Sequence, residues 1–104
     1  MSGALVEIRR YVAFPGRRAE LVDVMDRVVI PFVRARGVEV LASLVVPDDE
    51  DAYIWIRSFD DADDRDRAYA AIYEDPEWVD TIGPTVKKLM DVPRAVITTA
   101  TATA

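Results

Sequence analysis

The chain of 104 residues contains no cysteine and no histidine. Without cysteine, a disulfide, a thiolate nucleophile or an iron–sulfur cluster is excluded. Without histidine, the usual imidazole base, the usual zinc ligand and the proximal ligand of haem are missing too. These absences remove the side chains on which most metal and redox centres depend, so we expect neither a metal nor a cofactor.

Positive charge is also scarce. There are 13 Lys and Arg residues against 19 Asp and Glu residues, which gives a net charge of −6. Nothing concentrates the basic residues on one face, so nucleic acid and anionic membrane surfaces are disfavoured as partners. No apolar run approaches the roughly 20 residues of a membrane span, and no secretory leader precedes Leu5. We therefore expect a cytoplasmic protein.

Hydrophobic residues make up 51% of the chain and charged residues 31%, which is typical of a folded globular protein. The length suits one domain, residues 1–104, with one core. The Thr-Ala repeats of about residues 100–104 have low complexity. We expect them to fray or to extend an edge strand.

Four segments are predicted to be strands because they are rich in β-branched and aromatic residues. In the first, Leu5 to Phe14, alternate residues face opposite sides of the sheet. The second and third, Val38 to Val46 and Ala52 to Phe59, flank an acidic turn and should pair as an antiparallel hairpin. The fourth is Arg94 to Thr99.

Helical spacing predicts a first helix from about Arg17 to Arg36 with a buried stripe. The stripe consists of Leu21, Val24, Met25, Val28 and Phe32. Pro31 should kink or split this helix near Val28, and Gly37 should end it.

A second helix is predicted from about Ala62 to Tyr73, because the acidic run Asp60 to Asp64 offers N-caps. Asp75-Pro76 should then start another helical piece that buries Trp78, Val79 and Ile82. Gly83-Pro84 is expected to break that piece.

The predicted order is β-α-β-β-α-β, which is the ferredoxin-like arrangement of the α+β class. A single four-stranded antiparallel sheet would carry helices on one face only. The other face would expose more apolar surface than a monomer of this size usually does. We therefore expect a homodimer in which two sheets stack face to face.

Three stretches, in this order, resemble the NIPSNAP family over about Val6 to Ile97. They are Glu7-Ile8-Arg9-x-Tyr11 with Pro15-Gly16, then Ser58 to Arg65, then Asp75-Pro76-Glu77-Trp78. The resemblance implies a dimeric α/β barrel made of two ferredoxin-like halves, with ligands between sheet and helices. That superfamily includes cofactor-independent oxygenases, haem-degrading enzymes and lactone isomerases. The missing histidines argue against carrying over haem or histidine chemistry.

Glu7, Arg9 and Tyr11 are the candidate catalytic residues, because alternate strand residues share a face at a spacing of about 6.5–7 Å. If that face looks toward the helices, Arg9 would bind an anionic oxygen, Glu7 would act as a base and Tyr11 would donate to an oxyanion. The alternative is structural. Glu7 would pair with Arg9 or with Arg57 to fix the sheet register or the dimer.

A second group of residues suggests an aromatic wall for a flat, oxygenated ligand. The candidate ligand-binding residues are Trp55, Arg57, Tyr69 and Trp78. Packing in a core or an interface is the favoured alternative for each of them. The acidic run at 60–64 lacks the spacing of a calcium loop, and Lys87-Lys88 is most simply a solvated helix face.

Two functions remain open. The first is a cofactor-independent enzyme acting on a small aromatic or enolisable metabolite, as an oxygenase, isomerase or cyclase. The second is a non-catalytic dimeric module that binds a ligand or supports a larger assembly. An enclosed pocket between sheet and helices, lined by Glu7, Arg9, Tyr11 and Arg57, would favour the first. An interface filled by Leu21, Tyr69 and Trp78 would favour the second.

Overall fold

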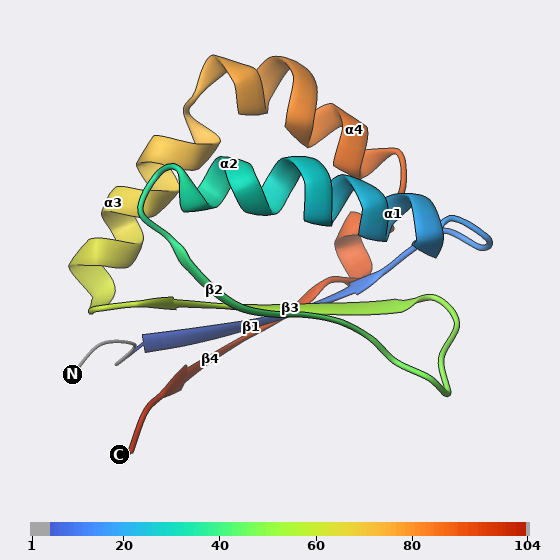
Figure 1. The fold of residues 1–104 in the computed structure, drawn as a ribbon, viewed down its shortest axis with the longest axis horizontal. Helices are drawn as coiled ribbons and strands as arrows, with labels where there is room; N and C mark the ends of the chain where they lie inside the picture. The colour runs from blue at the N-terminus through green and yellow to red at the C-terminus, as the bar shows by residue number, and fades with distance from the viewer. Residues whose placement is uncertain (1–4, 104) are drawn as a thin grey trace.

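The computed structural model describes residues 5–103, which form one antiparallel sheet with helices on one side (Figure 1). The strands are β1 (Leu5–Val12), β2 (Glu39–Val45), β3 (Ala52–Phe59) and β4 (Val96–Thr101). They lie in the order β2-β3-β1-β4, so β1 and β3 are central and β2 and β4 are the edges. This order confirms the predicted ferredoxin-like α+β fold.

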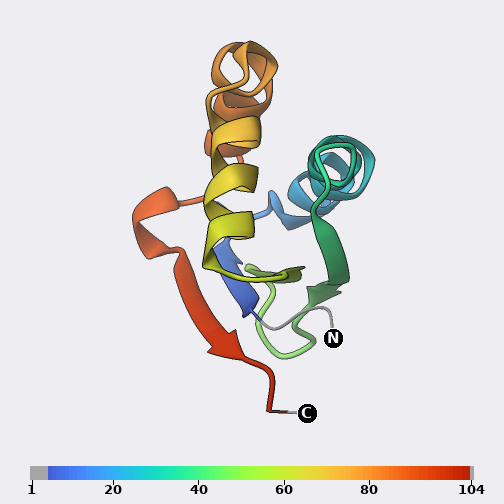
Figure 2. The ribbon, with the colours of Figure 1, turned by 90° about the vertical axis from the view of Figure 1, so that its left-hand side faces the viewer.

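Two groups of helices cover the sheet. The first consists of α1 (Arg18–Val24), the π-helical turn η1 (Met25–Val29) and α2 (Ile30–Arg34). The second consists of α3 (Ala62–Tyr73), the π-helical turn η2 (Trp78–Ile82) and α4 (Gly83–Lys87), and a short 3₁₀ turn, η3 (Val92–Arg94), leads into β4. Figure 2 shows the two groups apart from each other, the first viewed end-on and the second upright, with β4 extending away from both. No helix within residues 5–103 has the length and apolar character needed to cross a membrane.

Both π-helical turns precede a proline. The N–H of Ile30 donates to the carbonyl of Met25, and the N–H of Gly83 donates to that of Trp78, five residues back in each case. A proline in an ordinary α-helix clashes with the carbonyl four residues back, and the wider turn relieves that clash. Pro31 and Pro84 are thereby accommodated. The expected break at Gly83-Pro84 is therefore wrong, because the helix widens there and continues into α4.

The widened turns also move two residues to the surface. Val28 and Val79 were expected to be buried, but their exposed fractions are 42% and 54%. In a wider turn, more residues are needed to return to the same face. Val29 therefore takes the buried place expected for Val28, and Ile82 is buried while Val79 faces outward.

Helix starts and stops follow the predicted capping residues. The N–H of Asp64 donates to the Asp61 carboxylate at 2.8 Å, and the N–H of Glu77 donates to the Asp75 carboxylate at 2.8 Å. Gly37, with φ of +83°, ends the first helical group in the left-handed conformation that favours glycine. The acidic residues at 60–64 thus serve the start of α3.

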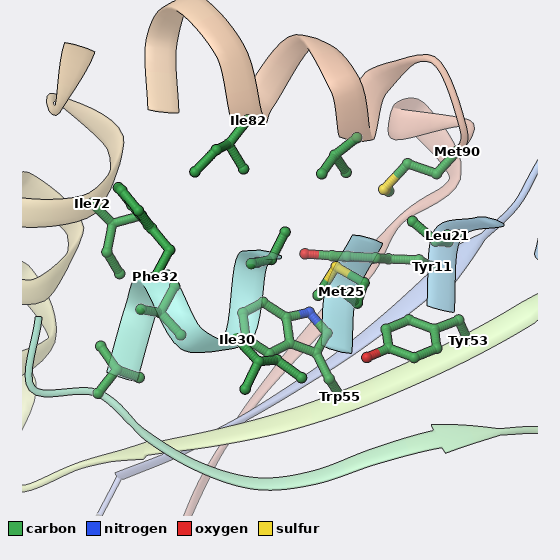
Figure 3. Close-up of a cluster of buried hydrophobic side chains, with 14 of the residues drawn as sticks. Tyr11, Leu21, Met25, Ile30, Phe32, Tyr53, Trp55, Ile72, Ile82 and Met90 are labelled. Atoms are coloured by element: carbon green, nitrogen blue, oxygen red, sulfur yellow. The ribbon is translucent and has the colours of Figure 1, made fainter. Parts of the chain in front are cut away.

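The alternation along β1 and β3 divides the sheet into two faces. One face lies under the helices, and Figure 3 shows Tyr53 and Trp55 rising from β3 into this layer. The other face has no helical cover, and we call it the open face. Its apolar side chains are half-buried or exposed; they are Val6, Ile8, Val12, Leu44, Ile54, Ile56 and Val96.

Candidate functional site

Glu7, Arg9 and Tyr11 all point from β1 toward the helices, which the sequence left undecided. Each is at most 8% exposed. On the neighbouring strand the antiparallel register sets Arg57 opposite Glu7 and Trp55 opposite Arg9. Because paired residues on adjacent strands share a face, these five side chains gather under the helices.

A buried ionic cluster joins Glu7, Arg9 and Arg57. Oε1 of Glu7 accepts from Nε of Arg9 and from Nε of Arg57, each at 2.7 Å. Oε2 of Glu7 accepts a short hydrogen bond from the hydroxyl of Tyr69. Both ion pairs considered from the sequence are therefore present, and both carboxylate oxygens of Glu7 are occupied.

The three groups of this cluster are all charged. Burial pushes the pKa of Glu7 upward, but the charge of Arg57 and the hydrogen bonds from Tyr69 and Arg9 outweigh burial and leave the pKa below its ordinary 4.5. Burial lowers the pKa of Arg9 and of Arg57, yet their polar and charged neighbours outweigh it and raise both values. The cluster thus contains two positive charges and one negative charge.

Each guanidinium also donates to a phenol. Nη1 of Arg9 donates to the Tyr11 hydroxyl at 3.0 Å, and Nη2 of Arg57 donates to the Tyr73 hydroxyl at 3.0 Å. A phenol oxygen that accepts in this way keeps its own proton for another acceptor. Burial raises the pKa of Tyr73 despite the opposing charge of Arg57, so Tyr73 is neutral and acts as a donor.

A cavity of about 310 Å³ lies between this cluster and the helices. Its polar lining comes from Arg9, Tyr11, Tyr73 and Lys87, and the rest is aromatic or aliphatic. The remaining lining residues are Met25, Val29, Trp78, Gly83, Val86, Met90, Val92, Ala95 and Ile97. The volume is at the lower end of the range for small-molecule sites, and an apolar wall with a few convergent polar groups is typical of them.

The predicted site residues separate into two groups. Arg9, Tyr11 and Trp78 line the cavity. Glu7, Trp55, Arg57 and Tyr69 do not line it and belong to the layer behind it. Nη1 of Arg57 and Nε1 of Trp55 are buried there and have no hydrogen-bond partner within residues 5–103. The layer behind the cavity therefore has more hydrogen-bond donors than acceptors.

Several lining residues were not predicted from the sequence. Met25 and Val29, which were not predicted, belong to one π-helical turn and Trp78, which was predicted, begins the other, so the widened helices form the sides of the cavity. Trp78 packs against Tyr73 with ring centroids 5.1 Å apart. A Cβ at Gly83 would lie 3.0 Å from Nε1 of Trp78, so a larger residue there would require the indole to shift by a few tenths of an ångström. A proline inside each helical pattern, Pro31 and Pro84, was the available signal.

No metal site is apparent in the described part of the chain. Within residues 5–103, no three acidic side chains gather closely enough to hold a metal ion. The arrangement is suited instead to binding a ligand that accepts hydrogen bonds or carries negative charge, because its polar groups are guanidinium, phenol and ammonium.

Comparison with known proteins places this geometry in a family. The NIPSNAP family model matches residues 6–103. No curated protein sequence matches the chain. Among solved structures, an uncharacterized NIPSNAP domain protein from Burkholderia xenovorans is similar, with a TM-score of 0.83 and 15% identity over 96% of this chain and 95% of that one.

Two further structures are similar in fold. A NIPSNAP family protein of unknown function from Agrobacterium tumefaciens has a TM-score of 0.82 and 21% identity, over 94% of this chain and 86% of that one. SnoaB from Streptomyces nogalater, a cofactor-independent oxygenase, has a TM-score of 0.71 and 22% identity, over 96% of this chain and 93% of that one.

Proposed function

The chain belongs to the NIPSNAP family, and from that premise we propose that it binds a small aromatic or enolisable metabolite in the cavity above β1 and converts it without a cofactor. The reaction would be of the oxygenase, isomerase or cyclase type. The observation that carries the proposal is the pair Arg9 and Tyr11 in a cavity whose lining is mostly apolar. The likeness in fold to SnoaB, a cofactor-independent oxygenase, supports it.

The chemistry would depend on stabilising an oxyanion. When a phenol or enol gives its proton to water, negative charge develops on its oxygen, and donors already held in place stabilise that charge without reorganising. Arg9 and Tyr11 are such donors, since Arg9 is fixed by Glu7 and in turn donates to Tyr11. In this proposal Arg9 and Tyr11 contact the ligand, and Glu7 acts through Arg9 because both of its oxygens are occupied.

Ligand binding can be tested by thermal shift with a panel of aromatic polyketides and quinones. A ligand that binds only the native state raises its stability, by about 2.7 kcal/mol at a hundred times Kd. Tyr11→Phe should reduce the shift because it removes one donor. Tyr53→Phe is a matched control, since Tyr53 lies opposite Tyr11 in the register but bonds to Ser43 and does not line the cavity.

Turnover is measured on the compounds that bind, by absorbance under air and under nitrogen. If the absorbance band of the substrate disappears with the wild-type protein but not with Tyr11→Phe, the result supports an enzymatic function. If the disappearance requires air, the reaction is that of an oxygenase. If no compound in the panel raises the melting temperature, the proposed small-molecule site is wrong.

A non-catalytic binding module is the alternative, and one observation favours it. The only carboxylate of the buried cluster is fully engaged, and the phenol of Tyr73 stays protonated, so the lining offers donors and no carboxylate base. Saturable binding without any turnover would support this alternative.

We also propose that the protein is a homodimer formed through the open face. Five half-buried aliphatic residues of β1 and β3 and exposed Leu44 and Val96 form an apolar surface that is large for a monomer. Strand β4 is exposed along its whole length and carries no charged residue. An uncharged edge strand of this kind is usually covered by another chain or segment.

A further inference from the structure

The buried cluster beneath the cavity has an unbalanced charge. Arg9 and Arg57 share one carboxylate, that of Glu7, and their side chains are almost completely removed from water. A buried positive charge without a counter-charge is costly, and an anion that reaches Arg9 would balance it. Of the two guanidinium groups, that of Arg9 lines the cavity.

The charge of the cavity lining is opposite in sign to the net charge of the protein. The net charge of the chain is −6, which repels anions at long range. Two basic side chains nevertheless line the cavity, Arg9 and Lys87, and no acidic residue is part of the lining. A positively lined pocket on an acidic protein attracts anions locally, and the apolar walls strengthen that attraction.

The two cations lie at different depths. Arg9 is 8% exposed and lies at the floor, on β1. Lys87 is exposed and lies in the last turn of α4, above the sheet, so it lies at the solvent-facing mouth of the cavity. Within residues 5–103 no carboxylate forms an ion pair with Lys87.

We propose that the ligand is a planar aromatic acid with two acidic oxygen groups at opposite ends. Its phenol or enol oxygen is held at the floor by Arg9 and Tyr11, and its carboxylate is held at the mouth by Lys87. The inference rests on the proposed function and adds to it the class of ligand and a specificity residue. The apolar middle of the cavity, which Met25 and Trp78 line, accommodates the rings.

Two probes of equal shape test the proposal. They are 6-hydroxy-2-naphthoate, which carries a phenol and a carboxylate at opposite ends, and 6-hydroxy-2-naphthamide, which lacks the negative charge. Both are titrated by calorimetry into the wild-type protein, Lys87→Gln and Lys88→Gln. Lys88 is the matched control, because it is the next residue of the same helix, is exposed and does not line the cavity.

The wild-type protein should bind the acid about fivefold more tightly than the amide, which corresponds to one ion pair at a partly exposed site. Lys87→Gln should remove this preference by weakening the acid alone, and Lys88→Gln should leave it unchanged. The preference should shrink as salt is raised, because the mouth is open to solvent.

The outcomes distinguish the proposed carboxylate site at Lys87 from the proposed ligand cavity as a whole. If both probes bind with equal Kd, or if Lys88→Gln weakens the acid as much as Lys87→Gln does, the carboxylate site at Lys87 is wrong while the cavity remains a ligand site. If Lys87→Gln weakens acid and amide equally, its role is packing and the inference also fails. If neither probe binds and no compound of the wider panel does, the proposed function itself is overturned.

Discussion

The two faces of the sheet carry opposite chemistry. Under the helices, β1 and β3 bury three charged side chains, Glu7, Arg9 and Arg57, among aromatic rings. On the open face the same strands present aliphatic residues such as Ile8 and Ile56, which are only half-buried in one chain. A typical amphipathic sheet has the reverse arrangement, with charges in water and aliphatic side chains in the core.

Strands β1 and β3, each of eight residues, therefore carry two different kinds of surface. The charges lie under the helices beside a cavity that Arg9 lines, and their burial is compensated by mutual pairing and by hydrogen bonds from Tyr69 and to Tyr73. Aliphatic residues are kept on the open face, where a second copy of the chain would remove them from water. Three changes test whether the two faces differ in this way.

The largest effect is expected from Glu7→Leu. It leaves two buried guanidinium groups without their carboxylate, which should lower the free energy of unfolding by about 3–5 kcal/mol in urea denaturation. Glu39→Leu is the control, because Glu39 is exposed on β2 and bonds only to Ser58 at 2.9 Å. Glu39→Leu should lower the free energy of unfolding by less than about 1 kcal/mol. Equal losses in the two variants would show that the buried cluster has no special role in stability.

The next effect concerns the open face. Ile56→Lys places a charge where the partner sheet would lie. The dissociation constant of the dimer, measured by sedimentation velocity, should therefore rise at least tenfold, which corresponds to a loss of about 1.4 kcal/mol or more in the free energy of association. Val28→Lys makes the same change at an exposed position of η1, away from the sheet, and should leave association unchanged. A wild-type protein that sediments as one chain at micromolar concentration would exclude the homodimer.

The smallest effect is expected in the pH dependence of stability. Because the pKa of Glu7 in the folded chain lies below its ordinary 4.5, the carboxylate contributes stability above that pH, and the contribution is lost as the pH falls through the lower folded value. Glu7→Gln lacks this titration. The difference in melting temperature between the wild-type protein and Glu7→Gln should therefore narrow below pH 4.5. A constant difference across that range would mean that Glu7 is not ionised in the folded chain.

Local patterns in the sequence were enough to predict the fold. The strand at Ala52–Phe59 and the helix at Ala62–Tyr73 have the predicted bounds. The alternation in β1 also assigned Glu7, Arg9 and Tyr11 to one face correctly. These features depend on residues that are close in the chain, through periodicity, capping and turn chemistry, so the sequence by itself determined them.

Only the tertiary structure decided which face of β1 lies under the helices and what meets it there. Arg57 reaches Glu7 across 50 residues of chain, and Tyr73 and Lys87 come to one cavity from α3 and α4. Local periodicity contains no information on such encounters, because they depend on the register of β1 with β3 and on how the helices cross the sheet. The widened turns before Pro31 and Pro84 likewise follow from packing, since a proline alone predicts a break as readily as a π-helical turn.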